Sequence, residues 1–466
     1  MRIAELEAQS AVDKARIVEL ELKVEALTRM VMALQERLDR NSGNSNSPPS
    51  SDSPGDRAER HGKGKSGKKR GGQPGHSGSS RKLLPPEQVS EFKNLFPLDC
   101  ENCWARLPPT PDPSAQRFQT IELPQPKAHV IEWLRHCVAC PRCHYKTWAS
   151  TESIPASPFG PRLSSVIALF TGVYHLGRRA AVRLLSDVVG VEISLGAVSA
   201  VEARVSEAVK PAVDEAWTQV EHSAVKHTDG TSWFQGGLLC SLWTVATAVA
   251  TVFKILKDGK ATTLAPLFGK KLGIMVSDRA TALNFWAMEL RQVCWAHLLR
   301  KAISFSERDG PAGALGRELL DYIAIMFDYW GQVKSGQSSR DNFRELMVPL
   351  RTQVEAVLER AVAAKLPHVS GSCDDILAHR AALWTFVERD DVEPTNNHAE
   401  RELRAFVLWR KRSFGTQSER GNLFAERLMT VAHTARKQHK NVLAFLTDCC
   451  TAARGGTTAP SLFAAA

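Results

Sequence analysis

The chain has 466 residues, too many for one hydrophobic core, so three or more structural units are expected. Its composition, 43% hydrophobic and 24% charged residues, is that of an ordinary soluble protein. The formal net charge of +10 favours a polyanionic partner, although many basic proteins bind no nucleic acid. The charged N-terminus predicts no secretory signal, and the most apolar stretch, 238–253, is too short to span a membrane. Ten cysteines without a secretion signal indicate a reducing compartment, so we expect a cytoplasmic protein.

Residues 1–39 are expected to form a coiled-coil helix. Mostly β-branched residues at one heptad position, with leucine at the other, favour a parallel two-stranded coiled coil. We therefore expect a homodimer or higher oligomer through this helix; the alternative is an amphipathic helix that packs on its own protein. The first position holds Ile17, Val24, Val31 and Leu38, and the second holds Leu20, Leu27 and Leu34.

Residues 40–90 are expected to form a low-complexity basic linker without fixed structure. Asn, Ser, Gly and Pro dominate its first half and bury too little apolar surface to offset the entropy of ordering. In its second half, Lys68, Lys69 and Arg70 lie among glycines and suit the phosphate backbone of DNA. The alternative is a solvated tether.

Residues 91–150 contain two CxxC motifs, which predict a small zinc-binding module. Each motif can supply two thiolates to a tetrahedral Zn²⁺, with Zn–S distances of about 2.3 Å. A closed four-cysteine site is structural, so it would support DNA binding or domain order rather than chemistry. The alternative, four packed thiols without a metal, leaves the paired spacing unexplained. The four expected ligands are Cys100, Cys103, Cys140 and Cys143.

Residues 151–221 are expected to be helical and to resemble a helix-turn-helix. One helix is predicted from Arg178, a turn follows at Gly190, and Ser194 is the expected N-cap of the next helix. Such a pair suits DNA binding, but an ordinary helical pair fits the pattern equally well.

Residues 222–301 are expected to be the first part of an α/β catalytic core. They are followed by a helical insertion (302–390), the C-terminal helices of the core (391–455) and a tail (456–466). Gly236-Gly237 marks a turn between the first two predicted strands. The order of elements is that of a ribonuclease H-like fold. The strands are predicted at 225–229, 238–248, 250–256 and 274–278, with a further element from 292, and the helices near 261–268 and 280–290.

Three carboxylates of this region are candidate metal ligands. Asp229 and Asp278 close apolar, strand-like runs, and Glu400 lies in the first turn of a predicted helix that Asn396 or Asn397 can cap. Carboxylates so placed can hold two divalent cations about 3.5–4 Å apart, the arrangement of two-metal phosphoryl transfer. The alternative for the two aspartates is strand-end capping. The rival acids near Glu400 are Asp390, Asp391, Glu393 and Glu402.

Several motifs in this order resemble the DDE transposases of the insertion-sequence-66 family, over nearly the whole chain. After the heptads and paired CxxC motifs come short sequences around the three acids and a basic stretch near the C-terminus. One departure is Gly230-Thr231 after the first acid, where the family more usually has Glu-Thr. The motifs that carry the resemblance are 71–76 (GGQPGH), Asp229, 277–279 (SDR), 294–301 (CWAHLLRK), 396–401 (NNHAER) and 410–421 (RKRSFGTQSERG).

The resemblance implies a bacterial, nucleoid-associated transposase that cleaves and joins DNA at the ends of an insertion element. Asp229, Asp278 and Glu400 would then bind Mg²⁺ (or Mn²⁺), with Asp229 bridging the two ions. His297 would orient a phosphate or water, although a structural histidine fits equally well. The candidate contacts to the DNA backbone are His297, Arg300, Lys301, Arg401, Arg404, Arg410, Lys411 and Arg412.

Two other functions share some of these features. A non-catalytic DNA-binding regulator derived from a transposase would use the zinc module and the helical region, but it has no need for clustered carboxylates. A nuclease of ribonuclease H type would share the metal site, but it would not need the coiled coil and zinc module that suit the pairing of two DNA ends.

Overall fold

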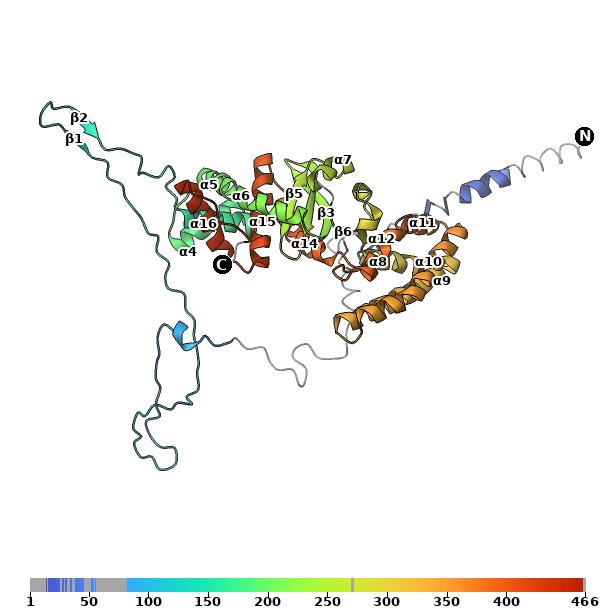
Figure 1. The fold of residues 1–466 in the computed structure, drawn as a ribbon, viewed down its shortest axis with the longest axis horizontal. Coiled ribbons are helices and arrows are strands. Elements are labelled where there is room, and N and C mark those ends of the chain that lie inside the picture. Colours follow the sequence, from blue (N-terminus) through green and yellow to red (C-terminus); the bar gives the residue numbers. More distant parts are fainter. Residues whose placement is uncertain are drawn as a thin grey trace, which may run out of the picture.

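The computed structural model describes residues 14, 16–25, 27–28, 30–31, 34–35, 38–45, 52–53, 55, 82–269 and 272–463. Most of the described helices pack around a central sheet, and a long excursion that is mostly free of helix and strand precedes them in the chain (Figure 1). The predicted basic strip at Lys68, Lys69 and Arg70 lies outside the described residues.

The central sheet is mixed and has the strand order β5-β4-β3-β6-β7. β3, β4 and β5 pair antiparallel, whereas β6 runs parallel to β3 and β7 runs parallel to β6. The carboxyl ends of the three neighbouring parallel strands therefore meet at one end of the sheet. The strands are β3 (Val225–Gln235), β4 (Leu238–Ala246), β5 (Thr251–Leu256), β6 (Ile274–Ser277) and β7 (Arg291–Val293).

The structure confirms the predicted strands and corrects two details. β3 continues to Gln235 instead of ending at Asp229, because its second half pairs with β4 across the predicted turn at Gly236-Gly237. The predicted helix at 280–290 is wrong, since this segment forms two short 3₁₀ turns, η4 (Thr281–Leu283) and η5 (Met288–Leu290). Between them Trp286 is only 2% exposed and donates its indole N–H to the Gly273 carbonyl at 3.3 Å.

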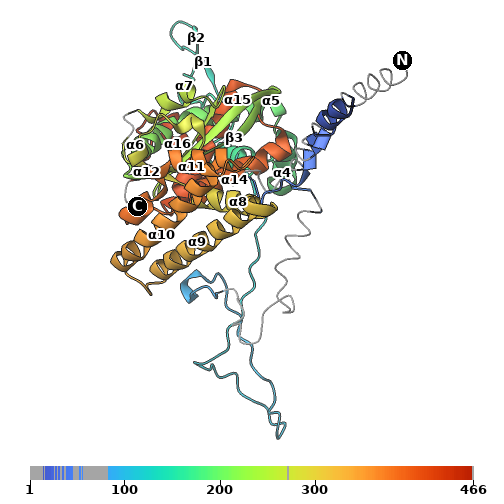
Figure 2. The same ribbon diagram turned by 90° about the vertical axis from the view of Figure 1, so that its right-hand side faces the viewer.

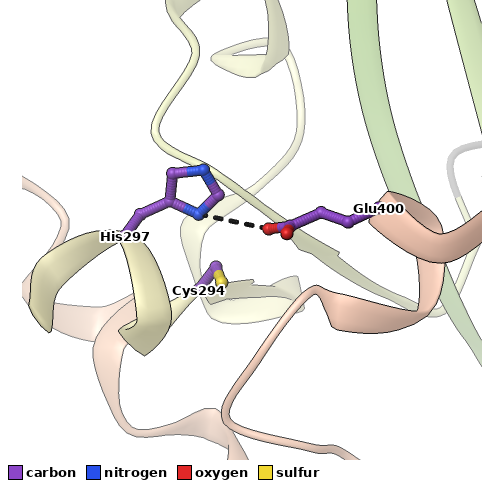
Figure 3. A group of neighbouring side chains, drawn as sticks. All are labelled: Cys294, His297 and Glu400. Atoms are coloured by element: carbon purple, nitrogen blue, oxygen red, sulfur yellow. Dashed lines mark ion pairs between the residues drawn. The ribbon is translucent and has the colours of Figure 1, made fainter. Parts of the chain in front are cut away.

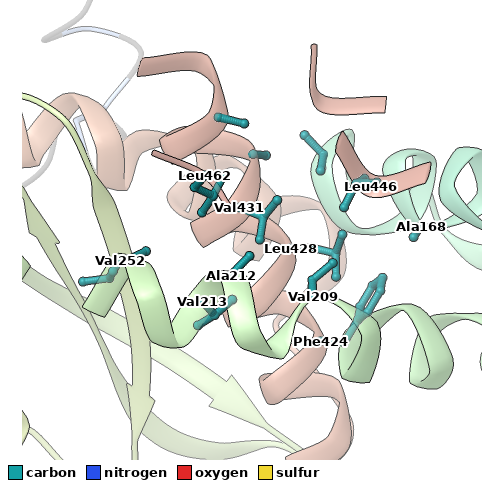
Figure 4. Close-up of a cluster of buried hydrophobic side chains, with 14 of the residues drawn as sticks. Ala168, Val209, Ala212, Val213, Val252, Phe424, Leu428, Val431, Leu446 and Leu462 are labelled. Carbon is teal, nitrogen blue, oxygen red and sulfur yellow. The ribbon is translucent and has the colours of Figure 1, made fainter. Parts of the chain in front are cut away.

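Helices from before and after the sheet build the largest hydrophobic core. Figure 4 shows this core, in which Ala212 and Val213 of α6 face Leu428 and Val431 of α15. The helices predicted between 160 and 215 are present, and Ser194 caps one of them by accepting a hydrogen bond from the Ala197 N–H at 3.1 Å. The helices of this core are α3 (Pro161–Ala168), continued by η2 (Leu169–Val173), α4 (Arg178–Val189), α5 (Leu195–Ala208), α6 (Lys210–Glu221), α15 (Glu419–Lys437) and α16 (Val442–Gly455).

The other face of the sheet carries two smaller cores. α14 (Asn397–Ser413) packs Leu403 and Phe406 against Trp233 and Phe253 of the antiparallel strands. The predicted insertion is helical, and together with α8 it packs on side chains of β6 and β7. Its longest helices, α9 and α10, lie side by side (Figure 2). The helices are α8 (Trp295–Ser306), α9 (Gly310–Lys334), α10 (Arg340–Ala363), α11 (Ser370–Ala378), α12 (Arg380–Leu383) and α13 (Thr385–Glu388).

The N-terminal third has little regular structure among its described residues. Every described residue from 14 to 38 is helical, and all seven predicted heptad residues are exposed by about half or more. A two-stranded hairpin follows much later, of β1 (Cys137–Ala139) and β2 (Lys146–Trp148). Within the described part of the chain, no helix combines the length and the apolar character that a bilayer crossing requires. The remaining short elements are η1 (Pro86–Gln88), α7 (Ala261–Leu264) and η3 (Ala265–Phe268).

Candidate active site

Asp229 and Asp278 each lie two residues beyond the last paired residues, His227 and Val276, of the parallel strands β3 and β6. β3 pairs with β6 in a register that sets Val225 opposite Ile274. The same offset of 49 residues (274 − 225) separates Asp229 from Asp278, so this register, continued, places the two aspartates opposite each other. Paired positions of adjacent strands direct their side chains to the same face of a sheet. Continued in this way, the register would set the two carboxylates on one face of the sheet, just past the end of the parallel pairing.

The strand next to β6, β7, is followed by Cys294, which adds a thiol beside Asp278. Ser277 pairs with Val293, so the next residues, Asp278 and Cys294, are also neighbours, and the Cys294 N–H donates to the Ser277 carbonyl at 2.8 Å. Cys294 is fully buried, and this burial raises the pKa of its thiol to about 11. Its sulfur is therefore protonated at neutral pH unless a cation binds it.

Asn396 attaches the start of α14 to the ends of two strands. Its side-chain amide donates to the Thr228 carbonyl of β3 at 2.7 Å, and its backbone N–H donates to the Cys294 sulfur at 3.1 Å. Two residues earlier, the Pro394 carbonyl accepts the Trp295 N–H at 2.9 Å. Asn396 stands at the N-cap position, but the predicted capping by its side chain is wrong, because that side chain reaches β3 instead.

Glu400 lies one helical turn after Asn396 and faces the start of α8. Its Oε1 is 3.7 Å from Nδ1 of His297 and 3.8 Å from a guanidinium nitrogen of Arg300. Figure 3 shows the His297 ring and the Glu400 carboxylate pointing toward each other above Cys294. Both separations are too long for hydrogen bonds, and the contact with His297 is an ion pair only when its imidazole is protonated. Glu400 Oε1 and His297 Nδ1 are both buried and have no hydrogen-bond partner.

The charges of the other two candidate carboxylates affect the pKa of Asp229. Its pKa is raised to about 7, first by burial and then by the negative charges of Asp278 and Glu400. The Gly230 N–H, which donates to Asp229 Oδ1 at 2.9 Å, and the charge of Arg300 act in the opposite direction without cancelling this rise. Asp278 and Glu400 are therefore near enough to act on the charge of Asp229, and a bound cation would stabilise the charged form of Asp229.

A cavity of about 350 Å³ opens beside Asp278, over the antiparallel half of the sheet. The Asp278 carboxylate also accepts the Ala280 N–H at 2.9 Å, which fixes its orientation at the cavity wall. The other lining residues are small or polar, with one aromatic ring among them: Gly230, Thr231, Ser232, Ser241, Trp243, Gly259, Ala280, Thr281 and Ala282.

Three of the four rival acids pair with residues away from this group. Glu402 binds His433 and lies 3.3 Å from the Lys437 ammonium, so it holds α14 to α15. Asp390 pairs with Arg340 at 2.9 Å and with Arg344 at 2.5 Å. Glu393 pairs with Lys334 at 3.3 Å. The fourth acid, Asp391, is exposed.

The predicted DNA-contacting residues fall into two groups. His297, Arg300 and Lys301 are partly buried on α8, and the first two lie against Glu400. On α14, the guanidinium of Arg410 hydrogen-bonds Ser232 and, at 3.1 Å, the Thr231 hydroxyl, so it attaches α14 to β3. The exposed cations of α14 are Arg401, Arg404, Lys411 and Arg412.

The two CxxC motifs form closely similar turns. The Trp104 N–H donates to the Cys100 carbonyl at 2.9 Å, and the His144 N–H donates to the Cys140 carbonyl at 2.8 Å. Both residues after the second cysteine have positive φ, 59° and 58°. Backbone N–H groups within each turn lower the pKa of Cys100 and of Cys140, which favours the thiolates that zinc binds.

These turns are not joined in one site. Among the described residues, the one group of three or more possible metal ligands within mutual reach is Cys294, His297 and Glu400. The structure therefore does not bring Cys100 and Cys103 together with Cys140 and Cys143, and zinc binding by these four residues stays a prediction.

Sequence reasoning did not assign two of the residues at this site. Cys294 was visible only within a motif, and Asn396 only as a possible helix cap. Their spacing to Glu400, 106 and 4 residues (400 − 294 and 400 − 396), gives no sign that all three would meet. The departure at Gly230 has a structural reason, because a Cβ there would lie 3.0 Å from the ring of Trp243, its partner on β4.

Fold and site together define a mixed α/β protein whose candidate active site gathers carboxylates at the ends of parallel strands. Over residues 156–423 the sequence matches the family described as Transposase IS66 family. The chain therefore belongs to the IS66 family of transposases. Residues 1–82 match a family of unknown function, DUF6444, a domain typical of IS66 transposases. No curated protein matches the chain.

Proposed function

We propose that this transposase is catalytically active and performs metal-dependent DNA strand cleavage and strand transfer at the ends of an insertion element. The observation that carries this proposal is that burial, and then the nearby negative charges of Asp278 and Glu400, raise the pKa of Asp229 to about 7. A protein that only binds DNA gains nothing from repelling carboxylates at a surface that must approach phosphates.

The strand order supports a ribonuclease H-like core for this reaction. Three antiparallel strands are followed by two strands parallel to the first, in the order β5-β4-β3-β6-β7. In this arrangement Asp229 lies on the central strand and Asp278 directly follows its parallel neighbour. Glu400 comes from the helix that packs over the same sheet face.

The three acids fit Mg²⁺ or Mn²⁺. All their donor atoms are oxygens, which these hard cations prefer, and Glu400 Oε1 is buried without a hydrogen-bond partner. Asp229 would bridge, with Asp278 and Glu400 each holding one ion. When bound, the ions supply an activated nucleophile and stabilise the leaving oxygen at the scissile phosphate.

The surrounding cations would position the DNA. Arg300 lies beside Glu400 and can bind a phosphate oxygen, while the ring of His297 lies 3.7 Å from the same Glu400 carboxylate. Burial and the charge of Arg300 lower the pKa of His297, which favours the uncharged form of its ring. The exposed Arg401, Arg404 and Lys411 of α14 are proposed to contact the backbone further from the scissile phosphate.

Two further features suit the pairing of two DNA ends. The exposed heptad residues of the N-terminal helix support self-association, and the similar CxxC turns support a structural zinc that would bring Cys100 and Cys103 to Cys140 and Cys143. Both are proposed here as parts of the assembly that holds DNA, not as parts of the chemistry.

Substitution of each acid tests the proposed reaction. Asp229→Asn, Asp278→Asn and Glu400→Gln are each expected to lower Mg²⁺-dependent cleavage of the element's end DNA by on the order of a thousandfold, with end binding retained. Asp391→Asn, at an exposed rival acid, is the matched control and should cleave like the parent. Cleavage that persists in all three variants would refute the catalytic assignment, and binding without cleavage by the parent would favour the regulator.

A further inference from the structure

A second set of metal ligands overlaps the proposed catalytic acids. The Cys294 sulfur, a ring nitrogen of His297 and a carboxylate oxygen of Glu400 all lie within 4.8 Å of one another (Figure 3). Cys294 immediately precedes α8 and His297 lies in its first turn, so the backbone fixes both on the same side of the helix start. Glu400 approaches from α14, which Asn396 attaches to the same strand ends.

Two polar atoms of this group lack hydrogen-bond partners. His297 Nδ1 and Glu400 Oε1 are buried and accept or donate no hydrogen bond, although buried polar groups are rarely left unpaired. The Cys294 sulfur accepts the Asn396 N–H at 3.1 Å, and hydrogen bonds of this kind orient metal-binding side chains. The two atoms without hydrogen-bond partners and the thiol face one another. This arrangement of donor atoms suits a cation better than a water molecule.

The chemistry of these ligands differs from that of the three acids. Thiol and imidazole are soft and intermediate donors that select Zn²⁺ and similar ions, whereas Mg²⁺ takes oxygen ligands. One sulfur, one nitrogen and one oxygen, with a fourth position left to water, form the ligand set of an open zinc site. We propose that Cys294, His297 and Glu400 bind one thiophilic divalent cation such as Zn²⁺. The Cys294 thiol proton leaves to solvent as the metal–sulfur bond forms.

Glu400 belongs both to this site and to the proposed Mg²⁺ site, so zinc binding would regulate cleavage. A carboxylate that binds Zn²⁺ together with Cys294 and His297 is not free to hold a catalytic ion with Asp229 and Asp278. Zn²⁺ and the Mg²⁺ pair therefore exclude each other, so free zinc inhibits cleavage. This consequence depends on the proposed function, whereas zinc binding itself does not.

Cobalt spectroscopy tests the binding site without reference to activity. Co²⁺ replaces Zn²⁺ and gives a near-ultraviolet thiolate-to-metal band when sulfur is a ligand. The test uses the full chain in which Cys100, Cys103, Cys140 and Cys143 are serines, so that the CxxC turns cannot contribute. The band is expected in this protein, absent after Cys294→Ser, and weakened at least tenfold in cobalt affinity after His297→Gln. Cys373→Ser, at another buried cysteine that lies outside the group, should leave the band unchanged.

A measurement without further substitution covers the case in which Cys294→Ser fails to fold. X-ray absorption of the zinc-loaded four-serine chain should show one sulfur and one imidazole in the first coordination shell. No zinc uptake, a shell without sulfur, or a cobalt band that survives Cys294→Ser would each overturn the inference.

Cleavage assays then test the regulatory role of zinc separately from zinc binding. With the CxxC cysteines intact, zinc should inhibit Mg²⁺-dependent cleavage by the parent, and Cys294→Ser should need at least tenfold more zinc for half inhibition. Equal zinc sensitivity of the two proteins would overturn the regulatory role. If the parent cleaves no DNA with Mg²⁺, the proposed function fails, while the cobalt and X-ray measurements still decide whether the metal site exists.

Discussion

Asn396 is the residue that brings the catalytic helix to the sheet. Its amide hydrogen bond to the Thr228 carbonyl, one residue before Asp229, fixes the distance between α14 and β3 at the candidate active site. Asn396 is fully buried, so removal of its side chain leaves that carbonyl without its partner. A buried hydrogen bond lost in this way costs about 1–3 kcal/mol.

Asn396→Ala is therefore expected to lower both stability and cleavage. A shift of Glu400 by about 1 Å reduces a positioned reaction by about a hundredfold. Thermal unfolding and Mg²⁺-dependent cleavage are the two measurements, and Asn397→Ala, at the exposed neighbouring asparagine, is the control that should alter neither by much. Cleavage unchanged in Asn396→Ala would show that another contact positions α14.

His175 makes stability depend on pH. Its ring stacks on Trp409 with centroids 4.5 Å apart, and its Nε2 is buried without a hydrogen-bond partner. Burial first, and then the charges of Arg412 and His433, lower the pKa of His175 to about 4. In the unfolded chain the pKa of histidine is about 6.5, so the unfolded state binds the proton more readily. This contribution to stability is fully present above pH 6.5 and is lost as the pH falls toward 4.

His175→Phe keeps an aromatic ring on Trp409 but cannot take up the proton. The free energy of unfolding should therefore fall less between pH 6.5 and 4 in the variant than in the parent, by about 1–2 kcal/mol after allowance for partial exposure. Denaturant titrations at several pH values measure this, with His129→Phe, at an exposed histidine, as the control. Parallel pH profiles for parent and His175→Phe would contradict the assignment.

At this scale, sequence reasoning predicts the three acids but not the residues that support them. Asp229, Asp278 and Glu400 stand out because each lies in a distinctive local sequence at the end of an apolar run or the start of a helix. Cys294 and Asn396 lie in such motifs too, but what they do depends on which strands are neighbours. Register across a sheet is a tertiary property, and a single sequence carries no direct record of it.

α15 protects one edge of the central sheet. Every second N–H of β5 donates to a side chain of this helix: Thr251 to Thr434 at 3.1 Å, Phe253 to Thr430 at 3.1 Å, and Ile255 to Glu426 at 2.6 Å. The three acceptors are spaced four residues apart, so they form one stripe along the helix. Unpaired edge strands invite pairing with other chains, and this stripe replaces the missing strand.

Thr430→Val with Thr434→Val should weaken this protection without changing side-chain shape. Two buried N–H groups would lose their acceptors, so a loss of about 2–4 kcal/mol in the free energy of unfolding is expected, together with faster aggregation on heating. Chemical denaturation and light scattering report the two effects. Thr447→Val on α16, where the hydroxyl only bonds back to the Leu443 carbonyl at 2.7 Å, is the matched control. Stability equal to the parent's would show that the edge needs no acceptors.

Element boundaries followed from sequence where one periodicity dominated. The helices of the insertion and the strands β4 and β5 agree with their apolar patterns. The segment 280–290 does not agree with its predicted helix. Its buried side chains Leu283 and Trp286 are three residues apart in sequence, and short 3₁₀ turns can bury residues at that spacing as well as a helix can. β3 was underestimated because its second half is mostly polar around the buried Trp233 and is held by pairing with β4.

For the whole molecule, the sequence predicts most of the helices and strands between 160 and 455, but not the contacts between them. The insertion begins within α8 and ends at 390, and its last helices cover the second sheet edge. There the Phe386 N–H donates to the Gln292 side chain of β7 at 2.8 Å, and that side chain donates to the Leu383 carbonyl at 3.1 Å. The insertion thus completes the sheet beside the candidate active site, and no local pattern between 302 and 390 predicts which strand it meets.

The N-terminal helix leads to a prediction about assembly. Its heptad residues Val24 and Leu27 are 61% and 59% exposed, although such side chains gain about 1.5–3 kcal/mol each on burial. A second copy of the same helix is the partner that the heptad register favours. Leu22 is equally exposed, at 59%, but lies two residues past Leu20, outside the heptad stripe. Exposure alone therefore does not distinguish a zipper from a generally apolar helix, whereas position in the heptad does.

Val24→Asp with Leu27→Asp should dissociate the oligomer, because two charges on the stripe would face the partner helix. A rise of at least about tenfold in the dissociation constant is expected, since 1.4 kcal/mol already gives that factor. Leu22→Asp is the matched control, with the same kind of charge placed on the same helix but off the stripe. Multi-angle light scattering over a range of concentrations gives the mass of each protein. If both variants have the mass of the parent, the helix does not pair through its heptads. The same conclusion follows if Leu22→Asp dissociates as readily as the double variant.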